Sequence, residues 1–124
     1  MDKLLYAREA YELTGICMDV HNQLRMGFLE IVYKDAIEHE LRNKGIWYER
    51  EKEYEVSYKD ITLRHKFYAD FVVYDKIILE VKSVNVLPDE FIAQCINYCK
   101  VSRNRLALLV NFGELKLKTK RVVV

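Results

Sequence analysis

The chain has few residues that break regular structure and no long apolar run. Its 124 residues include four glycines and one proline, which excludes a flexible linker or a low-complexity segment. No apolar run approaches the ~20 residues that a membrane-spanning helix requires, and the charged N-terminal segment lacks the apolar centre of a signal peptide. We therefore expect a single compact domain over residues 1–124, located in the cytoplasm and without membrane contact.

The chain also has little net charge and few cysteines. A net charge of +1 does not indicate a protein that coats nucleic acid, although a local basic patch would still attract phosphates. Three cysteines, Cys17, Cys95 and Cys99, are too few and odd in number for a disulfide framework. Because Cys95 and Cys99 have no second matching pair, we expect buried thiols rather than metal ligands.

The spacing of apolar residues predicts the element order ααβββαββ. The expected elements are helices over 3–25 and 29–44, strands over 46–58, 61–73 and 77–83, a helix over 88–102, and strands over 106–112 and 115–124. The residues expected to face inward or lie along a boundary on the third helix are Phe91, Ile92, Cys95, Ile96, Cys99 and Tyr98. Since a strand–helix–strand connection implies at least one parallel pair, the fold class is α/β (α+β) with a mixed sheet.

The residues that suggest a reaction lie on two consecutive strands. Asp70 interrupts an apolar strand, and Glu80 and Lys82 follow on the next, where alternation points both to one face. A short hairpin would bring Asp70 beside them. Two clustered carboxylates favour a divalent cation such as Mg2+, which would leave room for a phosphate oxygen. The lysine could orient the attacking water or stabilise the developing charge.

A structural interpretation of the same residues remains open. Asp70 and Lys82 could form a cross-strand ion pair, with Glu80 solvated at a sheet edge. The apolar run Ile77-Ile78-Leu79 directly before Glu80 argues against an edge, because it is typical of a central strand, where unpaired charges are costly.

These motifs resemble a known nuclease superfamily. Asp70 followed by Glu80-Val81-Lys82 resembles the D…(D/E)xK core of the PD-(D/E)xK nucleases, and Gly27-Phe-Leu-Glu30-Ile-Val-Tyr33 is similar to the signature of their GxxExxY family. Further similar positions, between about Thr14 and Val124, are His21 with Leu24, Tyr68-Ala-Asp70, Gln94…Tyr98 and Leu109-Val-Asn111-Phe112-Gly113. The resemblance implies a restriction-endonuclease-like αβββαβ core, with helices flanking the mixed sheet. It also implies a metal-dependent nuclease that uses Mg2+ or Mn2+ on DNA or RNA.

The resemblance also assigns roles to individual residues. It implies that Asp70, Glu80 and Glu30 bind the metal, and that Lys82 and Gln94 complete the catalytic set. Independently, helical spacing places Glu30 on one stripe with Tyr33, Ile37 and Leu41, which is expected to be buried, and so points Glu30 toward the core. Two alternatives remain open: a buried Glu30 that only forms a hydrogen bond to a neighbouring element, and a Gln94 without catalytic role at a helix boundary.

Substrate contacts are expected from aromatic and basic side chains. Tyr98, Lys100 and Arg103 on or after the third helix are the candidates for substrate binding. The alternative function is a catalytically inactive module that binds nucleic acid or another protein while retaining the nuclease fold. The aromatic residues that could form an exposed patch on such a module are Trp47, Tyr48, Tyr54 and Tyr58. A homodimer is compatible with each of these functions.

Overall fold

The computed structural model describes residues 4–124 and follows the predicted order of elements. These are α1 (Ala7–Leu24), α2 (Glu30–Asn43), β1 (Tyr48–Tyr58), β2 (Ile61–Val73), β3 (Ile77–Lys82), α3 (Asp89–Ser102), β4 (Leu106–Asn111) and β5 (Lys118–Val123). The first helix begins later than predicted, at Ala7, and the predicted start at residue 3 lies outside the described residues. Among the described residues, no helix is both long and apolar enough to cross a membrane.

The five strands form one mixed sheet in the order β1-β2-β3-β4-β5. All neighbouring strands are antiparallel except β3 and β4, which are joined by α3 and run parallel. The predicted parallel pair and the α+β class are therefore confirmed. The segment from α2 to β4 has the order αβββαβ, consistent with a restriction-endonuclease-like core, to which α1 and β5 are added.

Helices cover both faces of the sheet, and β3 separates two apolar cores. Ile77, Leu79 and Val81 pack with α1 and α2 in the larger core, whereas Ile78 packs with the buried face of α3 in the smaller one. All five residues from Ile77 to Val81 are buried, so β3 is a central strand as predicted. Alternation along β3 therefore places Glu80 on the α3 side of a buried strand.

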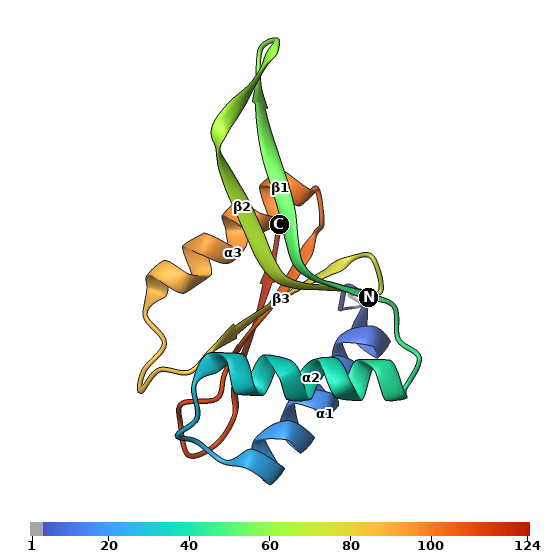
Figure 1. Cartoon of the computed structure of the whole chain (residues 1–124), viewed down its shortest axis with the longest axis vertical. Helices are drawn as coiled ribbons and strands as arrows, with labels where there is room; N and C mark the ends of the chain where they lie inside the picture. The colour runs from blue at the N-terminus through green and yellow to red at the C-terminus, as the bar shows by residue number, and fades with distance from the viewer. Residues whose placement is uncertain (1–3) are drawn as a thin grey trace.

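The β1–β2 hairpin extends well beyond the rest of the sheet, as Figure 1 shows. Its tip, residues 57–66, is exposed. Nearer the body, Tyr48 packs against the larger core and Tyr54 against the smaller one, so the two rings lie on opposite faces. The prediction of one exposed aromatic patch that includes both residues is wrong, because Glu51 between them has φ of 53° and interrupts the regular alternation of β1.

The apolar residues of α3 divide between the core and its boundary. Cys95 and Cys99 are buried, but Ile96 is 37% exposed, because it is turned about 100° from Cys95 on the helix. Burial raises the pKa of the Cys95 thiol to about 12 and that of Cys99 to about 11. Both thiols are protonated at neutral pH and are poor metal ligands, in agreement with a packing role.

Candidate active site

The candidate site lies where β2 and β3 separate. The last backbone pair of this ladder is Phe71 with Leu79. At the next position, the Asp70 backbone N–H donates to Oε2 of Glu80 (2.8 Å), and the Val81 N–H donates to Oδ2 of Asp70 (2.8 Å). Each carboxylate therefore accepts a backbone hydrogen bond from the other strand where the ladder ends. These two bonds fix the side chains of Asp70 and Glu80 near each other.

Burial of this pair changes the charge that it carries. Glu80 is 2% exposed and Asp70 is 9% exposed. Burial, and then the negative charge of Asp70, raise the pKa of Glu80 to about 8. The metal-free site therefore favours a proton on Glu80 over two negative charges side by side. A cation that replaced this proton would relieve the same repulsion.

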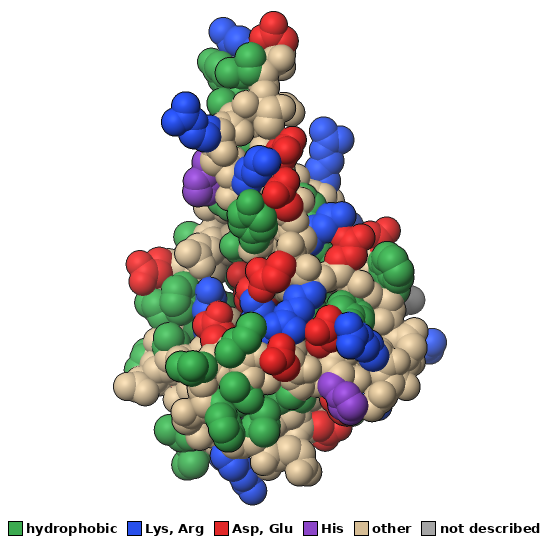
Figure 2. Space-filling view, in the orientation of Figure 1, with side chains coloured by type: hydrophobic (Ala, Val, Ile, Leu, Met, Phe, Trp, Pro, Cys, Tyr) green, Lys and Arg blue, Asp and Glu red, His purple; other side chains and the backbone are tan. Residues whose placement is uncertain are grey.

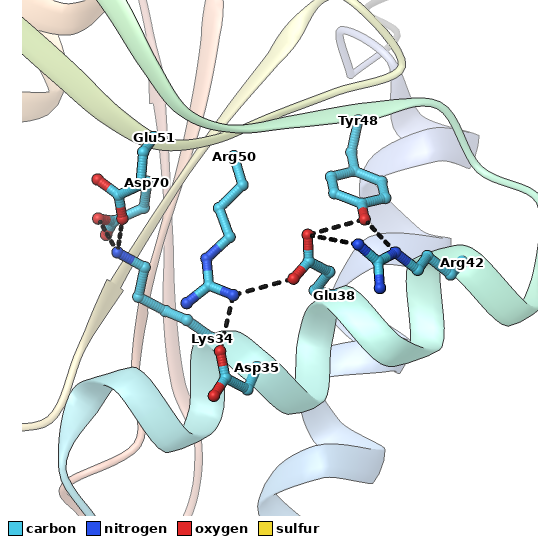
Figure 3. Close-up of polar contacts among 8 residues, drawn as sticks. All are labelled: Lys34, Asp35, Glu38, Arg42, Tyr48, Arg50, Glu51 and Asp70. Carbon is cyan, nitrogen blue, oxygen red and sulfur yellow. Dashed lines mark hydrogen bonds and ion pairs between the residues drawn. The ribbon is translucent and has the colours of Figure 1, made fainter.

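Lys34 of α2 places a positive charge beside Asp70, and sequence reasoning missed this residue. Its side chain is buried, and Nζ donates to Oδ1 of Asp70 (2.9 Å) and to the carboxylate of Glu51 on β1 (Figure 3). Burial lowers the pKa of Lys34, but the hydrogen bonds to Glu51 and Asp70 outweigh it and raise the pKa overall. The available signal was helical spacing, since Lys34 lies one turn after Glu30, which was expected to face inward.

Lys82 does not pair with Asp70, so the interpretation of these residues as a cross-strand ion pair is wrong. Its Nζ lies 4.7 Å from the ring centroid of Phe91 on α3. Within residues 4–124, Lys82 forms no ion pair. The half-buried ammonium stays available for a phosphate or a water molecule, held in place by the aromatic ring.

Glu30 lies in the same electrostatic neighbourhood. It is the first residue of α2 and is half-buried, and burial raises its pKa. The positive charge of Lys82 opposes this shift, while the negative charge of Asp70 adds to it. The structure therefore brings Glu30 near both residues, whereas the helical spacing predicted only that it points toward the core.

The loop before α2 is fixed by Tyr33, the last residue of the Gly27–Tyr33 motif. The Tyr33 hydroxyl donates to the carbonyl of Arg25 (2.6 Å) and accepts from the backbone N–H of Phe28 (3.2 Å). Gly27 has φ of 115°, a conformation that residues with a Cβ rarely adopt. The motif thus shapes the turn between α1 and α2 and fixes the start of the helix that carries Glu30.

The candidate residues on and after α3 lie at different distances from the carboxylates. Gln94 and Tyr98 line a groove of about 230 Å³ against β2, and Tyr98 is close enough to the carboxylates that Glu80 and Asp70 add to the burial that raises its pKa. Lys100 is exposed beyond them. Arg103 lies just before β4, beside the start of β3 at Ile77. Lys82 is at the other end of that strand, so the structure does not bring Arg103 to the carboxylates.

The donor set is compatible with a divalent ion bound by few protein ligands. No group of three His, Cys, Asp or Glu side chains within residues 4–124 is arranged to hold a metal. Mg2+, however, is commonly held by one or two carboxylates, with water and substrate phosphates as the other ligands. Asp70 and Glu80 provide that pair. The raised pKa of Glu80 and the hydrogen bond from the Lys34 ammonium to Asp70 both indicate that this carboxylate pair attracts positive charge.

Comparison with protein families agrees with this geometry. The PD-(D/E)XK nuclease superfamily matches residues 7–122, which include every helix and strand up to Val122 in β5. The chain belongs to the PD-(D/E)XK nuclease superfamily. Members of this superfamily generally use divalent metals. Neither the curated proteins nor the solved structures contain a significant match to the chain.

Proposed function

We propose that this PD-(D/E)XK chain is a metal-dependent nuclease of the GxxExxY type that hydrolyses phosphodiester bonds of DNA or RNA. The observation that carries the proposal is the pair of hydrogen bonds that holds the Asp70 and Glu80 carboxylates together at the end of the β2–β3 ladder. Lys82, on the same strand as Glu80, has no carboxylate partner among the described residues.

In this proposal Asp70 and Glu80 hold Mg2+ or Mn2+, and Glu30 contributes a nearby carboxylate. The bound ion would neutralise phosphate charge and lower the pKa of a coordinated water. Lys82 donates hydrogen bonds to the attacking water or to a phosphate oxygen, since its ammonium is held only by an aromatic ring. On the face that Figure 2 shows, basic and acidic side chains are intermixed, without a large patch of one charge.

The residues of α3 serve the substrate. Gln94 and Tyr98 lie in one groove, where an amide can hydrogen-bond to a nucleotide and a ring can pack against a base. We assign Lys100 and Arg103 contacts with phosphates farther along the nucleic-acid strand. Lys100 lies in the last turn of α3, and Arg103 directly follows the helix.

Cleavage of labelled single-stranded DNA, duplex DNA and RNA tests the proposal. Each substrate is incubated with Mg2+, with Mn2+ or with EDTA. We expect metal-dependent cleavage of at least one substrate by the wild type, reduced about 100-fold or more by Lys82→Ala. Lys76→Ala is the matched control, because Lys76 lies just before β3 at the far end and pairs with Glu9. Equal cleavage by the Lys82 and Lys76 variants would exclude Lys82 from the mechanism.

A second candidate function is a catalytically inactive module that binds nucleic acid or another protein. The observation that favours it is the Lys34–Asp70 ion pair, which compensates the site without a metal. This module would bind labelled nucleic acid in EDTA and leave it intact with either metal. A homodimer would suit cleavage of both duplex strands, and sedimentation equilibrium of the wild type measures whether it forms.

A further inference from the structure

Glu51, the second partner of Lys34, has an unusual backbone conformation. It lies inside β1 with φ of 53°, in the left-handed region that costs a non-glycine residue of order 1 kcal/mol or more. The pairs on either side are Arg50 with Phe71 and Lys52 with Ala69. The strained residue is therefore opposite Asp70, the one residue of β2 between those partners.

The contact of Lys34 differs from the other polar contacts between α2 and β1. Arg50 pairs with Asp35 and Glu38, and these side chains form a separate row along the helix in Figure 3. That row does not include a residue of the candidate active site. Lys34 alone reaches from α2 to a carboxylate of the site.

We propose that Lys34 is an internal counter-cation that a divalent metal displaces from Asp70, and that Glu51 retains Lys34 when this happens. The inference rests on the proposed function, since it requires Asp70 to hold the metal. It makes Lys34 and Glu51 positioning residues that set the metal affinity of Asp70, without a direct part in the chemistry.

The physical argument concerns the fate of a buried ammonium. The Lys34 ammonium lies 2.9 Å from Oδ1 of Asp70. It therefore competes with a metal ion for that oxygen, and its positive charge repels the ion. Removing a charged group from its only buried partner would be costly. Glu51 avoids this cost, because it already accepts a hydrogen bond from Lys34 and its half-exposed side chain can follow the ammonium away from Asp70.

The two positions should therefore change metal affinity in opposite directions. Lys34→Met removes the competitor, and because hydrogen bonds to charged groups contribute about 1.5–3 kcal/mol, binding should tighten about tenfold or more. Glu51→Gln removes the alternative partner, keeps Lys34 on Asp70 and should weaken binding. In the double variant the Glu51 substitution should have no further effect, since it acts only through Lys34.

The experiment is a calorimetric titration of Mn2+ into the wild type, both single variants and the double variant. Arg50→Met is the matched control: it also removes a cation that joins β1 to α2, but one whose partners are Asp35 and Glu38. It should change the affinity less than twofold, roughly the scale of a screened surface charge. Thermal unfolding in EDTA verifies folding, and Lys34→Gln replaces Lys34→Met if the latter does not fold.

The outcomes separate this inference from the proposed function. Tighter binding by the Lys34 variant and weaker binding by the Glu51 variant would support both. Equal affinities in all variants would overturn the inference and leave the metal site intact. Binding only by the Lys34 variants would support the inference but count against a metal-dependent wild-type enzyme. Absence of binding in every protein would overturn both.

Discussion

The proton on Glu80 should make the stability of the metal-free protein fall as pH rises. Folding raises the pKa of this carboxyl from 4.5 to about 8, mainly by burial. The folded state therefore binds one more proton than the unfolded state between these values, so the free energy of unfolding decreases by about 1.4 kcal/mol per pH unit. Over the whole interval the loss approaches about 5 kcal/mol, a large part of the stability of a small domain.

Urea denaturation in EDTA at several pH values between 5 and 8 measures this dependence. Glu80→Gln is the comparison, because glutamine can still accept the hydrogen bond from the Asp70 N–H but carries no titrating proton. The difference in unfolding free energy between the two proteins should change by about 1.4 kcal/mol per pH unit, in favour of the variant as pH rises. Other titrating groups are common to both proteins and cancel.

Metal binding gives the same prediction a second test. Because a divalent ion requires the deprotonated carboxylate, Mn2+ affinity should rise up to about tenfold per pH unit below pH 8, with one proton released. Parallel pH curves for the wild type and the Glu80 variant in EDTA would refute the reasoning. They would show that Glu80 is already ionised in the metal-free protein.

Four further substitutions test the packing of the fold and of the site. Lys82→Ala should reduce cleavage about 100-fold or more but change the free energy of unfolding by no more than about 1 kcal/mol in urea denaturation, because only a cation–π contact is lost. Gly113→Ala should destabilise the fold by about 1–3 kcal/mol in urea denaturation, since a Cβ there would lie 2.3 Å from the backbone oxygen of Val84. Gly15→Ala should stabilise the fold slightly in the same assay, because a Cβ on Gly15 of α1 would meet no other atom and alanine favours a helix. Tyr33→Phe should cost about 1–2 kcal/mol by thermal unfolding, through loss of both hydrogen bonds of the hydroxyl.

Much of the fold could be predicted because it depends on local periodicity. The run Ile77–Val81 predicted a central strand, and its burial on both faces confirms this. Tyr33, Ile37 and Leu41 predicted the buried stripe of α2, and all three are fully buried. The sequence did not separate buried from boundary positions on α3: Cys95 is fully buried and Ile96 is 37% exposed, because only tertiary packing decides between two apolar positions on the same helix.

The site could be predicted in part for the same reason. Strand alternation predicted that Glu80 and Lys82 share one face of β3, which the structure shows to be the α3 side, and the predicted hairpin brings Asp70 to Glu80. The partner of Asp70 could not be deduced this way. Lys82 is near in sequence, but the ion pair forms with Lys34, 36 residues away on α2.

In the proposed site, this difference makes metal affinity a property of the whole fold rather than of the D…ExK motif. The motif places two carboxylates together, and burial disfavours a negative charge on both of them. Which cation neutralises them depends on residues that the motif does not contain: Lys34 lies on the preceding helix and Glu51 on the neighbouring strand. Two chains with the same motif could thus differ in metal affinity according to the residue at the position of Lys34. A chain without a cation there should depend more strongly on its metal for stability, because no side chain would take the place of the ion.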